Sequence, residues 1–334
     1  MDKMNSTRAE IMKMPAPHIS QITNEDLFSR SDVDVIKTLG KGGYSEVFLA
    51  SWKGVPYKLV VKKYHIADVD KTPANRGIKR MHFDAEIKCL NNLEHTHIAK
   101  LFTALVTSSG NLGYVIMEHY PGGDLFHFSH RYMLNGDQMA KIFMGVSMAL
   151  SYIHEKRIFH QDIKPQNILL DGYGRAVLTD FGLASKLKEG QNSVTSWHTT
   201  IGHYGPELCL GRRFCPFKLD MYSFGITLWK TVFKLSSTAF DPFTFTHTCT
   251  SLVPYFKDAL LKLLHPVPCA RWDSGQFENH FRSTPRSTQI FIMQPQDPTA
   301  HYILLAQKRN PNAVPVPQPL AVVPFYTFRF GYTR

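Results

Sequence analysis

The pattern of hydrophobic positions divides the chain into two parts. Short runs of β-branched and aromatic residues, punctuated by glycines, begin at about residue 32 and predict a small antiparallel sheet. These runs cover residues 33–36, 47–49, 59–61, 98–106 and 114–117, and a helical spacing interrupts them at 83–93. After residue 123 the pattern predicts an amphipathic helix over 137–157 and a buried helix over 219–233. We therefore expect an α+β architecture with a small sheet-rich lobe followed by a larger helical lobe.

Sequence character also suggests where the folded domain begins and ends. Residues 1–31 have no sustained period, and we expect an N-terminal extension that is flexible or docks late. Residues 32–282 are expected to form the domain, with an N-lobe at about 32–117, a hinge at 118–122 and a C-lobe at 123–282. Residues 283–334 are a proline-containing tail. The tail is either a spacer or a segment recruited by an aromatic-lined groove of another protein.

Composition and charge exclude several classes of protein. With 334 residues, 43% hydrophobic and 12% aromatic, the chain can bury a sizeable core. Its five cysteines are scattered without a CxxC pair, which favours a reducing intracellular compartment, cytoplasmic or nuclear, over a disulfide framework. No apolar run reaches membrane-spanning length, so we expect no membrane association. The net charge of +11 is spread along the chain, which does not favour nucleic-acid binding.

The stretch from His160 to Gly182 carries the most informative candidate chemistry. Two short apolar runs at 168–170 and 175–178 flank a turn-forming sequence and predict a hairpin. Its open end would bring Asn167 beside Asp180, two oxygen ligands suited to a hard cation such as Mg²⁺. Asp162 would lie near enough to take a proton. This combination is typical of phosphoryl transfer.

A glycine-rich turn and a candidate ion pair lie upstream of this hairpin. Because strand follows the turn at 40–47, a dinucleotide fold is excluded, and the missing GK[ST] ending excludes a Walker-type loop. A strand–turn–strand cover over phosphates remains, with an ordinary tight hairpin as the alternative. Lys62 ends the run at 59–61, and Glu86 on the next helix could reach back to it. A solvated lysine at a strand edge is the alternative for Lys62.

Taken in order along the chain, these motifs resemble the eukaryotic protein kinases. The matching set is Gly40-x-Gly42-x-x-Ser45-x-Val47, Lys62, Glu86, His160-x-Asp162-x-Lys164-x-x-Asn167, Asp180-Phe181-Gly182 and Gly205-Pro206-Glu207. The resemblance covers about residues 32–282 and implies a two-lobed α+β kinase fold that uses ATP and Mg²⁺ to phosphorylate protein substrates. Lys164 and Thr200 match the serine/threonine branch, which implies Ser/Thr acceptors.

The resemblance also implies roles for individual residues. Lys62, held by Glu86, would contact the α- and β-phosphates. Asn167 and Asp180 would bind magnesium, and Asp162 would accept the proton of the substrate hydroxyl. Lys164 and Thr200 would complete the catalytic group. The implied nucleotide-binding residues are Leu39, Gly40, Lys41, Gly42, Gly43, Tyr44, Ser45, Glu46, Val47, Val60, Lys62, Met117, Glu118, Tyr120 and Leu169.

Further residues resemble the family's internal supports. A stacked hydrophobic spine joining the lobes would consist of Leu90, Leu101, His160 and Phe181. Asp220 on the buried helix would anchor that spine, and Arg271 would pair with Glu207 to brace the substrate-binding segment.

Gln161 is the main departure from the family pattern. Many kinases have arginine there, which pairs with a phosphorylated activation segment. Phosphate on Ser193, Thr195 or Ser196 would lack that partner. We therefore expect activity that does not require phosphorylation of the activation segment.

Smaller departures affect the nucleotide site and the helical lobe. Val60 replaces the usual alanine and is expected to tighten the roof over adenine, whereas Gly205 in place of alanine is expected to be a small change. The chain between Asp220 and Arg271 is short for the family. Such drift around an intact core suits a fast-evolving lineage such as a large DNA virus, which would place the protein in a host cell.

Two alternatives to a protein kinase remain open at this stage. A pseudokinase would keep the fold as a scaffold or allosteric binder, but such proteins usually lose the equivalents of Lys62, Asp162 or Asp180, and all three are present. A kinase acting on small molecules is the other alternative. The segment from Asp180 to Glu207 resembles one that docks peptides and argues against it.

Overall fold

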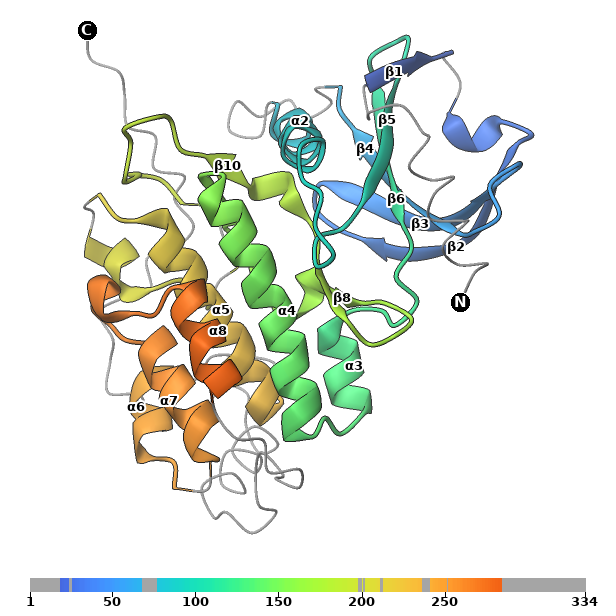
Figure 1. Cartoon of the computed structure of the whole chain (residues 1–334). Coiled ribbons are helices and arrows are strands. Elements are labelled where there is room, and N and C mark those ends of the chain that lie inside the picture. The colour runs from blue at the N-terminus through green and yellow to red at the C-terminus, as the bar shows by residue number, and fades with distance from the viewer. Residues whose placement is uncertain are drawn as a thin grey trace, which may run out of the picture.

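The computed structural model describes residues 19–23, 26–67, 77–197, 200, 202–210, 213–235, 241–250 and 252–283. A sheet with helix α2 (Ile78–Leu90) beside it forms one part of the molecule, and the remaining helices form the other (Figure 1). The α+β class and the order of the two lobes expected from the sequence are confirmed. The first 18 residues and the tail beyond Ser283 lie outside the described residues.

The described sheet has six strands in the order β1-β5-β6-β4-β3-β2. The strands are β1 (Ile19–Ile22), β2 (Val33–Lys41), β3 (Ser45–Trp52), β4 (Leu59–His65), β5 (Leu101–Thr107) and β6 (Leu112–Glu118). Neighbouring strands are antiparallel except for β1 and β5. The strand expected over 98–106 starts at Leu101, because Ile98 instead forms a bridge with Leu178 of the helical lobe.

Part of the expected N-terminal extension packs onto this sheet. Ile19 to Ile22 pair with β5, and Leu27 is fully buried in a hydrophobic cluster on the sheet. Asp26 forms an ion pair with Lys63 and accepts a hydrogen bond from the Tyr114 hydroxyl at 2.8 Å. A strand of four residues is too short to show a period in the sequence. The domain boundary itself stays a prediction.

The helices begin close to where the sequence predicts them. They are α2, α3 (Leu125–Arg131), α4 (Gly136–Glu155), α5 (Pro216–Phe233), α6 (Pro242–Thr248), α7 (Pro254–Leu263) and α8 (Ser274–Ser283). Helix α2 starts five residues before 83, since its first turn is mostly polar. Asn135 and Gln138 form a capping box at the start of α4, which satisfies two backbone groups there. Pro216 occupies the first turn of α5, where a missing N–H costs nothing.

Short strands place the candidate site between the two lobes. They are β7 (Ile158–Phe159), β8 (Ile168–Leu170), β9 (Ala176–Leu178) and β10 (Ser185–Lys186), which pair as β8 with β9 and β7 with β10. Gly122, in the expected hinge, donates its N–H to the Leu170 carbonyl at 2.9 Å. A Cβ on Gly122 would lie 2.7 Å from that same oxygen, so only glycine lets the connecting segment lie this close to β8.

In the part of the chain that the structure describes, none of the helices combines the length and the apolar character needed to cross a membrane.

Candidate active site

The hairpin expected between Asn167 and Asp180 is present. Its strands β8 and β9 pair from Ile168 with Leu178 to Leu170 with Ala176. The N–H of Thr179 donates to the carbonyl of Asn167 at 3.0 Å, which holds the open end of the hairpin together. Asn167 Nδ2 donates to both the carbonyl and Oδ2 of Asp162, at 2.8 and 3.0 Å. The hairpin thus fixes the position of the predicted proton acceptor.

Asp162, Lys164 and Thr200 form one hydrogen-bonded set, here termed the Asp162 group. Lys164 Nζ lies 2.6 Å from Asp162 Oδ2, and Thr200 Oγ1 donates to Asp162 Oδ1 at 2.6 Å. Lys164 Nζ also lies 2.9 Å from Thr200 Oγ1, which closes the triangle. The structure therefore brings Thr200 to Asp162 and Lys164, which lie 38 and 36 positions earlier in the chain. A buried carboxylate held this way can accept a proton from a hydroxyl placed beside it.

Lys62, Glu86 and Asp180 form a second charged set, here termed the Lys62 group. Lys62 Nζ lies 2.7 Å from Glu86 Oε1 and 2.9 Å from Asp180 Oδ1. Burial alone would lower the pKa of Lys62, but Asp180 and Glu86 raise it well above its ordinary value. Burial would likewise raise the pKa of Asp180, yet Lys62 brings it down to about 2. Lys62 and Asp180 are therefore both charged at neutral pH.

Tyr64 completes the Lys62 group and was missed by sequence analysis. Its hydroxyl donates to Glu86 Oε2, so both oxygens of that fully buried carboxylate are satisfied. Burial raises the pKa of Tyr64 well above its usual range, and the Glu86 charge adds to this effect. The available signal was strand alternation, because Lys62 and Tyr64 are two positions apart on β4 and share one face of the sheet.

Asp220 supports the backbone before Asp162. Its two carboxylate oxygens accept the N–H groups of His160 and Gln161 at 2.8 and 2.9 Å. Gln161 has φ +71°, a left-handed conformation that is rare for a residue with a side chain. Asp180 also has a left-handed backbone, with φ +66°. Such strained residues persist when surrounding contacts hold them, and they cluster at functional sites.

The expected spine residues are buried and the two aromatic ones touch. The ring centroids of His160 and Phe181 are 4.7 Å apart in an edge-to-face arrangement. Leu90, Leu101 and Phe181 belong to one hydrophobic cluster that spans both lobes.

The glycine-rich turn connects β2 to β3 as expected. The N–H of Gly42 donates to the Ser45 carbonyl at 2.9 Å, which closes the turn. A Cβ added at Gly40 or Gly43 would meet no atom within 4 Å, so packing within the described chain does not account for these glycines. Tyr44, at the tip, stacks on His82 of α2 with ring centroids 3.8 Å apart. The tip therefore lies against the helix that carries Glu86.

The residues expected around adenine gather where β4, β6 and β8 meet. Val60 pairs with Met117 across β4 and β6. Val60 and Leu169 are partly buried against the main hydrophobic cluster, which also contains Met117 and Tyr120. The Tyr120 hydroxyl donates to Glu118 Oε2 at 3.1 Å and accepts the backbone N–H of Lys100.

The other residues expected to bind the nucleotide lie on β2 and β3, next to the glycine-rich turn. Leu39 is 43% exposed. Lys41 and Glu46 form an ion pair at 2.5 Å across the mouth of the glycine-rich turn. Ser45 and Val47 lie on β3 opposite Tyr64 and Lys62, respectively.

Asn167 and Asp180 fit a magnesium ion by the chemistry of their donors. Asn167 directs its Nδ2 to Asp162, which leaves the amide oxygen available. Asp180 uses Oδ1 for Lys62, and its side chain is 43% exposed. Two protein oxygens suit an ion that completes its shell with phosphates and water. Within the described ranges, no cluster of three or more His, Cys, Asp or Glu side chains is arranged to hold a metal.

The segment after the hairpin is fixed at its far end by Glu207 and Arg271. Arg271 Nη2 lies 2.6 Å from Glu207 Oε2, and a second bond joins Nη1 to Oε1. Both side chains are buried. A Cβ on Gly205 would lie 2.3 Å from Glu207 Oε2, so alanine at this position would displace the carboxylate. The expectation that glycine in place of alanine is a small change here stays a prediction.

Comparison with known proteins identifies the family. A family model described as "Protein kinase domain" matches residues 33–247, well over half of the chain. The chain belongs to the protein kinase family. The matched range contains the Lys62 group, the Asp162 group and Asn167, and the kinase fold expected from the motifs is confirmed.

Several serine/threonine kinases are similar to this chain. The human SNF-related serine/threonine-protein kinase is 29% identical over 260 residues, covering 74% of this chain and 33% of that protein. The CBL-interacting serine/threonine-protein kinase 15 of Arabidopsis thaliana is 31% identical, covering 59% of this chain and 45% of that protein. The maternal embryonic leucine zipper kinase of Danio rerio is 29% identical, covering 59% and 28%. The chain thus spans less than half the length of each of these relatives.

Proposed function

We propose that this member of the protein kinase family transfers the γ-phosphoryl group of ATP to serine or threonine hydroxyls of protein substrates. The observation that carries the proposal is that the Lys62 group and the Asp162 group are both fully assembled. A scaffold that only kept the fold would have no need of both charged sets. Similarity to serine/threonine kinases supports the choice of acceptor.

Each group has a distinct task in this proposal. Lys62, held by Glu86, binds phosphate oxygens of the nucleotide, and the turn at Gly40 to Ser45 covers them. Asn167 and Asp180 would hold magnesium, which when bound neutralises phosphate charge. Asp162 takes the proton of the acceptor hydroxyl. Most of the rate enhancement then comes from positioning and from fixed charges.

Lys164 and Thr200 orient the proton acceptor. Lys164 donates to one oxygen of Asp162 and Thr200 to the other, so the carboxylate plane is fixed before substrate binds. The Lys164 ammonium also places positive charge next to the point from which the hydroxyl would attack the γ-phosphorus, with ADP as the leaving group. A threonine hydroxyl at this place links the catalytic loop to the segment that ends at Glu207.

A transfer assay tests the proposed function. The 334-residue chain, given γ-labelled ATP, MgCl₂ and a generic basic protein, is expected to label serine and threonine. Lys62→Met removes the charge and keeps a side chain of similar length. We expect the transfer rate to fall about 10²- to 10³-fold, the range for one preorganised electrostatic contact. Lys53→Met, at an exposed turn, is the matched control and should keep wild-type rates. Nucleotide binding without transfer to any protein would instead support the scaffold alternative.

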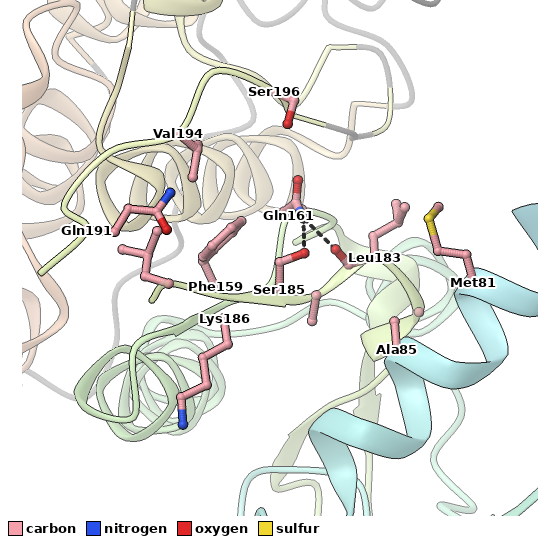
Figure 2. A pocket seen from close by; sticks show the side chains of 13 residues that line it. Met81, Ala85, Phe159, Gln161, Leu183, Ser185, Lys186, Gln191, Val194 and Ser196 are labelled. Atoms are coloured by element: carbon pink, nitrogen blue, oxygen red, sulfur yellow. Dashed lines mark hydrogen bonds between the residues drawn. The ribbon is translucent and has the colours of Figure 1, made fainter. Parts of the chain in front are cut away.

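The proposed kinase holds its activation segment through neutral contacts at Gln161. Figure 2 shows the Gln161 amide pointing to the chain that follows Gly182. Its Nε2 donates to the Leu183 carbonyl at 2.5 Å and to Ser185 Oγ at 3.2 Å. These residues line a pocket of about 290 Å³ that α2 closes with Met81 (Figure 2). An amide that binds the segment directly has no need of a phosphate to bridge them.

Activity is therefore expected to be insensitive to phosphatase. Phosphatase treatment, or a variant with alanine at Ser193, Thr195 and Ser196, should change the transfer rate less than twofold. Gln161→Ala removes two hydrogen bonds and is expected to lower the rate about 30-fold, since each is worth about 1 kcal/mol. Gln276→Ala serves as control, because it also removes a side-chain amide contact, in which Gln276 Oε1 accepts the N–H of Asp273 at the start of α8. Loss of activity on dephosphorylation would contradict this prediction.

A further inference from the structure

Helix α5 presents a stripe of polar side chains to the catalytic loop. The four residues recur at intervals of three and four, which places them on one face of the helix. They are Asp220, Ser223, Thr227 and Lys230. All four are buried, in a helix whose other residues are mostly apolar. We term them the α5 stripe.

The first three members of the α5 stripe satisfy backbone groups. Each makes hydrogen bonds to main-chain atoms of the catalytic loop or of the segment after Thr200. Asp220 accepts hydrogen bonds from the N–H groups of His160 and Gln161. Ser223 donates to the carbonyl of His203, and Thr227 donates to the carbonyl of Ile163. These residues have a structural task that explains their burial.

Lys230 differs from the other three, because its partner is a side chain without charge. Lys230 Nζ lies 2.9 Å from His203 Nε2. Burial lowers the pKa of His203 to about 3, and Lys230 adds to this, so the imidazole is neutral and accepts the bond. Burial also lowers the pKa of Lys230 to about 8, which keeps the ammonium mostly charged at neutral pH. An ammonium has three N–H donors, and His203 uses one of them.

The other buried cations of the described chain have carboxylate partners. Lys62 pairs with Glu86 and Asp180, and Arg271 pairs with Glu207. Lys230 is 7% exposed, about as buried as Lys62, yet no Asp or Glu in the described ranges forms an ion pair with it. A buried charge without a counter-charge is costly. Its retention is expected where the charge serves binding.

The position of Lys230 relates this charge to the substrate. Its partner His203 lies three residues after Thr200, which bonds to Asp162. The same face of α5 reaches the catalytic loop, because Ser223 donates to the His203 carbonyl and Thr227 donates to the carbonyl of Ile163, the residue after Asp162. Tyr204, the next residue, is 40% exposed, so the chain reaches the surface one residue after the buried His203.

We infer that Lys230 and His203 form an anion-recognition site that binds an acidic side chain of the protein substrate close to the acceptor hydroxyl. The inference rests on the proposed function and adds a substrate preference to it. The anion is a carboxylate of aspartate or glutamate, or the phosphate of an already phosphorylated serine. The anion supplies the counter-charge that no described carboxylate gives to Lys230. It accepts hydrogen bonds from the two N–H groups of the ammonium that His203 does not use.

Peptide phosphorylation tests this inference. The probes are alanine-rich peptides with one serine and a single Asp, Asn, phosphoserine or Lys at each of three positions on either side. For wild type we expect kcat/KM to be about tenfold higher for Asp than for Asn at one position, a typical gain for one charge-assisted contact. In Lys230→Met that ratio should fall to about 1, and in Lys230→Glu the Lys peptide should become the better substrate. The phosphoserine arm shows which anion is preferred.

Controls separate this inference from the proposed function. Lys234→Met removes the same charge one turn further on, where the ammonium lies 3.2 Å from Met133 Sδ, and should keep the Asp preference. An Asp:Asn ratio that is the same in wild type and Lys230→Met would overturn the inference. Polarisation of fluorescein-labelled peptides measures binding without transfer. If the Asp peptide binds wild type more tightly than Lys230→Met but is never phosphorylated, the proposed function is contradicted and the inference stands. If wild type and Lys230→Met bind the Asp peptide equally, the inference is overturned.

Discussion

Replacing Asp162 with asparagine is expected to slow phosphoryl transfer by about 10²- to 10⁴-fold, which is about 3–5 kcal/mol of activation free energy. The amide has nearly the same shape, so it can keep the contacts with Lys164 and Asn167 that the carboxylate makes through Oδ2. It cannot accept the proton of a hydroxyl. The change thus removes the base and leaves the Lys62 group intact, because none of that group's hydrogen bonds involve Asp162.

Two measurements distinguish loss of the base from loss of nucleotide. The rate of γ-phosphoryl transfer at saturating ATP should fall, while the affinity for ATP, measured by titration, should change less than about threefold. Asp258→Asn on the exposed face of α7 makes the same chemical change far from the site and should keep wild-type rates. If Asp162→Asn retained more than a tenth of the transfer rate, Asp162 would not be the base.

Local patterns in the sequence were sufficient for most of the fold. Strand alternation and helical spacing placed β3 to β6, α4 and α5, since each of these elements has buried positions that recur along it. The β-branched residues of β2 also predicted a strand, although only Val33 of its nine residues is buried. Strand β1 and the buried Leu27 were not expected, because four residues and one side chain carry no period. Their position is decided by a distant partner, the pairing of β1 with β5.

The candidate site likewise contains some residues that local motifs predict and others that they do not. Motif spacing pointed to Asp162, Asn167 and Asp180, and the structure gathers them because one hairpin fixes all three. Contacts between side chains remote in sequence gave no local signal. Glu207 lies next to Gly205 and pairs with Arg271, which is 64 residues away in the sequence. Lys230 on α5 contacts His203, which lies 27 positions earlier in the chain, and neither residue belongs to a recognisable motif.

Replacing Arg271 with methionine is expected to lower the free energy of unfolding by about 3–5 kcal/mol, because it leaves the buried Glu207 carboxylate without a counter-charge. Arg271 is 1% exposed and also donates to the carbonyls of His265 and Lys218. The guanidinium lies over the Tyr222 ring, 4.6 Å from its centroid. For a domain of this size the melting temperature should fall by roughly 10 °C, as measured by calorimetry or circular dichroism.

A double variant shows how much of this loss comes from the unpaired carboxylate. Arg271→Met combined with Glu207→Gln removes both charges, so we expect the double variant to recover about 1–2 kcal/mol relative to Arg271→Met alone. Arg30→Met is the matched control, since Arg30 makes the same forked contact with Asp32 but its side chain is 43% exposed. An exposed pair of this kind contributes at most about 1 kcal/mol. Equal destabilisation by Arg271→Met and Arg30→Met would show that burial of the Glu207 charge does not make this ion pair essential to the fold.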